Sequence, residues 1–125
     1  MRIALIVLCS VGLWSVVGEA QDNTEHQQHY PNVSTDVVFE NDRMLVQKVV
    51  LDPGEWEGIH SHFGNQLFIM LTDGQSTVRY GDQETTSVSR AGSVGWKQAV
   101  ALSERHESGN TGDTPLEFLW VNLKQ

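Results

Sequence analysis

The chain has 125 residues and a formal net charge of −8 at neutral pH. That length suits one folded domain, and the negative charge argues against nucleic acid or an anionic membrane surface as a partner, because both would repel the protein. The composition includes one cysteine, so disulfide bonds within the chain are excluded.

The first 20 residues have the anatomy of a secretory signal peptide. Arg2 gives a positive start, residues 3–17 are almost continuously apolar, and small residues precede Gln21. A retained membrane anchor is the alternative, but the apolar run is shorter than the roughly 20 residues of a spanning helix. We therefore expect cleavage after Ala20 and a secreted or periplasmic protein that has no membrane partner. Cleavage also removes Cys9, so the domain is held by its core, or by its core and a metal.

Residues 21–36 are polar and show neither a helical nor a strand period, which predicts a flexible N-terminal arm leading into a domain at residues 37–125. His26 and His29 lie in this arm at a spacing that suits metal binding. We interpret them as solvated side chains instead.

Short strands and turns alternate from Val37 onward, and no helix is predicted. The turns carry dipeptides such as Asp73-Gly74, which favours a tight hairpin, and Gly81-Asp82. Expected strands occupy residues 37–39, 44–51, 67–72, 75–80, 83–88, 93–96 and 116–123. Short strands at such regular spacing indicate an all-β sandwich or barrel.

The histidine pair of the sequence His60-Ser61-His62 is the feature of the domain that most directly suggests a chemical function. On an extended strand the two side chains project to the same face, roughly 7 Å apart. Imidazoles placed in this way can bind one first-row metal ion at bonds of about 2.1 Å. Most such pairs in soluble proteins are only polar positions on one side of a strand, so the pair alone is a weak signal.

Two motifs resemble those of the cupin superfamily. The first combines a glycine, the histidine pair, an amide and a glycine turn: Gly54, His60, His62, Gln66 and Gly74. The second runs from His106 to Asn110 and continues as Thr-Gly-Asp-Thr-Pro-Leu-Glu-Phe.

The resemblance covers residues 44–123 and is to small, single-domain, exported cupins of the type-2 conserved barrel, dioxygenase-like kind. It implies a double-stranded β-helix, the cupin jelly-roll barrel, that holds one divalent transition metal in its mouth. His60, His62 and His106 are the implied ligands. The metal is Fe, Mn, Zn, Ni or Cu, since imidazole suits them all.

The chain departs from the cupin pattern where a glutamate ligand is usual, because Gln66 and Leu67 occupy those positions. Glu57 precedes His60 and does not match the motif. The expected site is three imidazoles, with or without the Gln66 amide oxygen. These neutral ligands leave the full 2+ charge on the ion, which favours a chelating anion such as an enolate, an α-hydroxy or α-keto acid, or a catechol-like diol.

A second departure is the segment between Gly92 and His106, which is longer than the cupin pattern and lacks its proline-glycine turn. Longer loops at a barrel mouth commonly shape a substrate pocket. Strand alternation places Phe68 and Met70 on the face of Gln66, where they line the substrate pocket or fill the core. The same two alternatives hold for Trp96.

Two functions remain open. The first is a metal-dependent enzyme, either dioxygenase-like or a Lewis-acid lyase or isomerase. No catalytic residue is assignable beyond the metal. The second is a non-catalytic module that binds a small ligand, because a fold does not fix a function. The expected partner is a small-molecule ligand or substrate, and a homodimer stays open.

Overall fold

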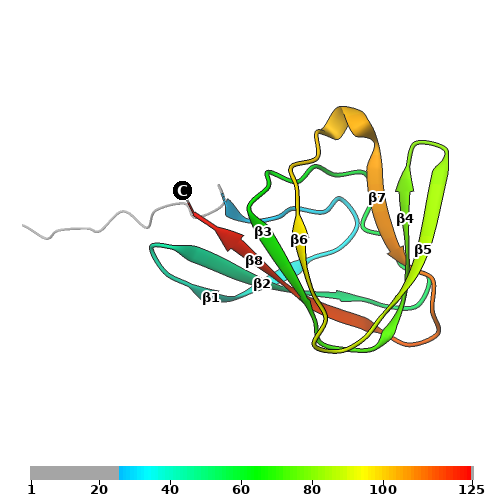
Figure 1. Ribbon diagram of the computed structural model, residues 1–125, viewed down its shortest axis with the longest axis horizontal. Coiled ribbons are helices and arrows are strands. Elements are labelled where there is room, and N and C mark those ends of the chain that lie inside the picture. The colour runs from blue at the N-terminus through cyan, green and yellow to red at the C-terminus, as the bar shows by residue number, and fades with distance from the viewer. Residues whose placement is uncertain (1–25, 125) are drawn as a thin grey trace, which may run out of the picture.

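The computed structural model describes residues 26–124, which form two antiparallel β-sheets facing each other (Figure 1). The strands are β1 (Thr35–Glu40), β2 (Met44–Leu51), β3 (Gln66–Met70), β4 (Gly74–Tyr80), β5 (Gln83–Ser89), β6 (Val94–Lys97), β7 (His106–Asn110) and β8 (Leu116–Leu123). One sheet has the order β1-β2-β8-β3-β6, and the other has the order β5-β4-β7. The described part of the chain is therefore all-β, apart from a 3₁₀ conformation at His26 and a 3₁₀ turn, η2, at Leu102–Glu104.

The long pair of β2 and β8 forms the centre of the larger sheet, with Met44 opposite Leu123 and Leu51 opposite Leu116. Every second side chain of both strands is buried, as in a sheet with one face on the core. Strand β3 pairs with β8 and β6 and buries its two ends, Gln66 and Met70.

The barrel interior has an apolar part and a polar part. Its apolar cluster contains Tyr30, Val49, Leu51, Met70, Leu116, Phe118 and Trp120. Buried amides and imidazoles make up the polar part: Gln28, Gln47, His60, His62, Gln66, His106 and Asn122. Buried polar groups of this kind must satisfy one another or a ligand.

The N-terminal segment differs from the sequence-based expectation. We predicted a flexible arm over residues 21–36, and that prediction is wrong for the described residues 26–36. Gln28 and Tyr30 are only 3% and 8% exposed, and β1 begins at Thr35 instead of Val37. The segment is ordered because its amide and aromatic side chains fill the polar and apolar parts of the interior, while His29 is exposed, as expected.

The predicted signal peptide at residues 1–20 lies outside the described residues. Within residues 26–124, no helix is long and apolar enough to cross a membrane.

Candidate metal centre

Three histidines from two distant segments meet inside the barrel. His60 and His62 lie between β2 and β3, and His106 begins β7. The backbone N–H of His60 donates to the His106 carbonyl at 3.0 Å, which holds the two segments together. The ring nitrogens that face one another all lie within 4.8 Å, and the three residues are 1–4% exposed.

The hydrogen bond of His60 fixes its tautomer. Its Nδ1 lies 2.8 Å from the Gly58 carbonyl, which can only accept, so Nδ1 carries the hydrogen and Nε2 keeps a lone pair. That Nε2 lies 3.0 Å from Nε2 of His62. Two bonds of about 2.1 Å at roughly a right angle would place their nitrogens about 3.0 Å apart. The spacing therefore fits two ligands of one ion.

A chain of amides fixes the tautomer of His62 as well. The backbone N–H of Gln28 donates to Gln47 Oε1 at 2.7 Å, and Asn122 Nδ2 donates to the same oxygen. Asn122 Oδ1 then accepts from Gln66 Nε2 at 2.8 Å, and Gln66 Oε1 accepts from His62 Nδ1 at 2.9 Å. Because a backbone N–H can only donate, it orients each amide in turn, and His62 is left with its lone pair on Nε2.

His106 completes the set in a different way. Both of its ring nitrogens are buried and have no hydrogen-bond partner among the described residues. A buried polar atom without a partner is rare, and a missing ion is one of its usual causes. The Tyr80 ring packs against the imidazole, with centroids 4.6 Å apart. The three residues thus fit one divalent metal ion, with the unpartnered His106 as the clearest sign.

The electrostatics agree with a ligand role. Burial lowers the pKa of His62 to about 3 and that of His106 to about 4. Burial also lowers the pKa of His60. All three imidazoles are therefore neutral at pH 7, which is the form that binds metal.

Solved structures with similar backbones share one architecture. A cupin domain from Bordetella pertussis superposes with a TM-score of 0.66 at 21% identity, over 79% of this chain and all of that one (100%). The chain has the cupin fold. A protein from Thermus thermophilus matches with a TM-score of 0.53 at 24% identity, covering 86% of this chain and 99% of that one. A predicted oxalate decarboxylase from Thermotoga maritima gives 0.54 at 23% identity, covering 79% and 95%.

No protein-family model and no curated protein sequence matches the chain. The double-stranded β-helix implied by the two motifs is confirmed. At these identities the solved structures establish the cupin fold alone, so the chemistry has to be argued from the site.

Gln66 occupies one of the positions where cupins carry a glutamate, and its amide group hydrogen-bonds to other side chains of the interior. Its oxygen accepts from His62 Nδ1, and its nitrogen donates to Asn122 and, at 3.2 Å, to Gln28. With oxygen and nitrogen both engaged, Gln66 orients a ligand and is not one itself. A hydrogen bond of this kind behind a metal-binding histidine normally sets its orientation and basicity.

Glu57 is the site residue that sequence reasoning missed. It is 3% exposed, and its Oε2 lies 3.8 Å from His60 Nε2. Burial raises the pKa of its carboxyl group to about 8, because the charged form loses water. The carboxyl group is therefore mostly protonated at pH 7 in the metal-free protein.

A backbone bulge explains why strand alternation missed Glu57. The N–H of Glu57 donates to the Ser108 carbonyl, and the N–H of His60 donates to the His106 carbonyl. The chain therefore advances three residues on one segment, from 57 to 60, and only two on the other, from 108 to 106. Gly58 absorbs the extra residue with φ +81°, a conformation that favours glycine. Strict alternation would put Glu57 and His60 on opposite faces, whereas the bulge puts both inside. A glycine between an acid and a histidine pair was the signal available in the sequence.

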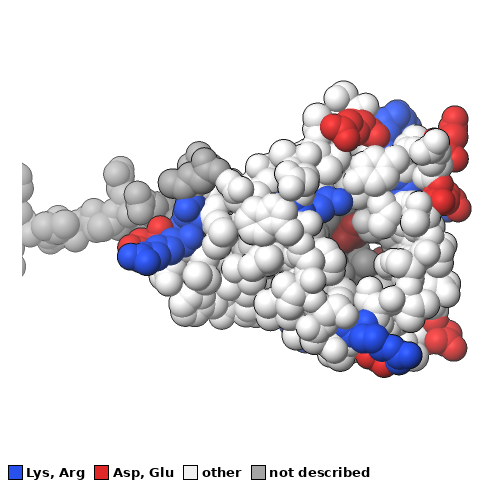
Figure 2. Space-filling model, viewed as in Figure 1, with Lys and Arg blue, Asp and Glu red and all other residues white. Residues whose placement is uncertain are grey.

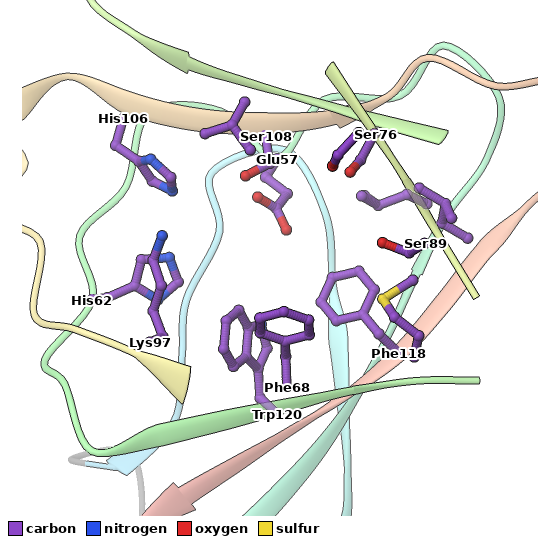
Figure 3. A pocket seen from close by; sticks show the side chains of 15 residues that line it. Glu57, His62, Phe68, Ser76, Ser89, Lys97, His106, Ser108, Phe118 and Trp120 are labelled. Carbon is purple, nitrogen blue, oxygen red and sulfur yellow. The ribbon is translucent and has the colours of Figure 1, made fainter. Parts of the chain in front are cut away.

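A cavity of about 190 Å³ adjoins the histidines (Figure 3). Its polar lining consists of Glu57, His62, Lys97, His106 and four serines, Ser76, Ser87, Ser89 and Ser108. Phe68 lies on its wall in Figure 3, and Met70, on the same face of β3, lines it as well. Trp96 does not line the cavity, because its side chain points outward from β6 and is 47% exposed. A role for Trp96 in the pocket or the core is therefore a wrong expectation, because its side chain lies on the solvent face of an edge strand.

Proposed function

We propose that this cupin-fold protein is a metal-dependent enzyme that binds one divalent transition metal and acts on a small anion that chelates the ion. The observation that carries the proposal is the buried histidine cluster, in which His60 and His62 direct lone pairs at one point and His106 has no partner. When bound, the metal would polarise the chelated substrate as a Lewis acid or, if it is iron, bring dioxygen chemistry.

The charge of the substrate follows from the donor set. The three histidines are neutral, and Lys97 adds a second cation to the cavity wall, so the site would stay positive even with Glu57 ionised beside the ion. An anion would balance both charges. Oxalate, in the name of the Thermotoga maritima neighbour, is a small chelating anion, and we propose the same broad class here.

Glu57 and Lys97 are the side chains through which the protein itself would act. The buried Glu57 carboxyl group can hold a proton at its oxygen and donate it to a group in the cavity, or take one up when ionised. The Lys97 ammonium, whose Nζ lies 3.4 Å from the Tyr80 hydroxyl, can hold a carboxylate in place.

The proposal is tested by titrating pyruvate, a bidentate α-keto acid, into metal-free protein and into protein loaded with Zn²⁺ or Mn²⁺. We expect heat of binding only in the loaded samples. Chloride serves as the matched control, because it is an anion that cannot chelate. Equal binding of pyruvate to the metal-free protein would refute a metal-dependent role.

A further inference from the structure

Aromatic rings form one wall of the cavity beside the metal centre, and charged and hydroxyl groups line its other sides. His62, His106 and Lys97 lie at one end in Figure 3, and aromatic rings from β3 and β8 form the wall that leads away from them. On this face of the molecule, Figure 2 shows a hollow with acidic atoms inside it and basic atoms near its rim. A ligand in the cavity therefore meets charge at one end and an aromatic wall along one side.

The apolar wall is a packed aromatic cluster. Trp120 meets Phe68 edge-to-face with centroids 5.8 Å apart, and it meets Phe118 in the same way at 6.1 Å. Phe118 and Trp120 are 8% and 6% exposed. Rings held in this way keep their positions, so the wall is preformed.

The size of the cavity limits what fits. Protein interiors are close-packed and rarely leave large voids, and a cavity of about 190 Å³ beside aromatic rings has room for a ligand. An apolar cavity of about 150 Å³ is known to hold a benzene ring. The space thus suits one ring with a short polar arm reaching the histidines.

We propose that the substrate is a small anion whose chelating group is attached to an apolar body the size of one aromatic ring. This inference rests on the proposed function, since the metal would hold the chelating group. A chelator with no apolar part, such as oxalate, would leave Phe68 and Phe118 facing water. A sugar acid would bury some of its hydroxyl groups against the same rings, although the serines of the opposite wall could bond the others.

The experiment compares two α-keto acids with the same head, pyruvate and phenylpyruvate, in calorimetric titrations of the Zn²⁺-loaded full-length protein. The added ring contacts the aromatic wall, so we expect phenylpyruvate to bind at least tenfold more tightly. Oxalate and galacturonate are titrated under the same conditions, and each should bind more weakly than phenylpyruvate.

Two variants test whether the preference for phenylpyruvate arises from the apolar part of the cavity. Ser89→Phe places a ring beside Phe118 from β5, where the side chain is half-buried, and should abolish the preference for phenylpyruvate over pyruvate. Phe68→Leu should reduce the preference severalfold. Trp96→Leu is the matched control, because this exposed aromatic lies on the neighbouring strand and faces away from the cavity.

The outcomes separate the two proposals. Tighter binding of phenylpyruvate that is lost in Ser89→Phe supports the apolar body. Equal affinities, or tightest binding of oxalate or galacturonate, overturn it and leave a metal-dependent site for small anions intact. If no anion binds the Zn²⁺-loaded protein, the proposed function fails and the inference fails with it.

Discussion

Glu57→Gln is the substitution whose effect can be worked out most fully from the structure. It keeps the size of the buried side chain and removes its ability to ionise. In the unfolded chain the carboxyl group has its ordinary pKa of 4.5, whereas burial raises the pKa in the folded protein to about 8. A raised folded-state pKa gives stability that is fully present below pH 4.5 and is lost as the pH rises towards 8.

The expected difference in the free energy of unfolding follows from the same two pKa values. At pH 7 the unfolded carboxyl group is about 2.5 pH units above its pKa, and the folded one is still mostly protonated. Each unit is worth about 1.4 kcal/mol, so ionisable Glu57 lowers the free energy of unfolding by about 3 kcal/mol at pH 7. The Gln variant should be more stable than the wild type by about that amount at pH 7, and by close to zero near pH 4.5.

The assay is urea unfolding of the two metal-free proteins, followed by tryptophan fluorescence at pH 5, 6, 7 and 8. The lowered pKa values of the three histidines also change stability with pH, but they are common to both proteins and cancel in the difference. Glu104→Gln, on the exposed η2 turn, is the matched control and should track the wild type. If the wild-type and Glu57→Gln profiles run parallel from pH 5 to 8, Glu57 is not a buried, protonated group and this reasoning is wrong. Saturating Zn²⁺ should shrink the difference, because a nearby cation favours the ionised carboxylate.

Three further predictions test the supporting structure. Gln66→Leu removes the acceptor for His62 Nδ1–H and should weaken Zn²⁺ binding by 10- to 100-fold in a competition titration. Undiminished affinity would refute the orienting role. Gly58→Ala places a methyl group 2.9 Å from Asn32 Nδ2 at φ +81°, so it should lower the midpoint of urea unfolding by more than Gly81→Ala, where a Cβ meets nothing within 4 Å. N-terminal sequencing of exported protein should begin near Gln21, and an intact Met1 on the mature form would contradict the predicted signal peptide.

The strands and the histidines were accessible from the sequence because they leave local signals. Residues 44–51 and 116–123 are rich in apolar and β-branched side chains between turn signals, and β2 and β8 occupy those ranges. The His60-x-His62 pair and His106 were linked only through their resemblance to two cupin motifs. The structure brings these three together, as the motifs imply.

The positions of Gln28, Glu57 and Trp96 depend on long-range contacts that local sequence patterns do not encode. Gln28 looks like part of a solvated arm, yet it is buried because Gln47, 19 residues away, satisfies both its backbone N–H and its carbonyl. Strand alternation predicts that Glu57 faces away from His60, but the bulge at Gly58 turns its side chain inward. Trp96 looks like a core residue, but it lies on the outer face of an edge strand.

Metal content tests the central claim most directly. Elemental analysis of the protein, purified from its own export route and dialysed, should find close to one transition-metal ion per chain. His106→Ala should lose that ion, and His29→Ala, which removes an exposed histidine, should keep it. Metal retained undiminished in His106→Ala, or a wild-type protein that binds no transition metal even when one is supplied, would contradict the three-histidine site.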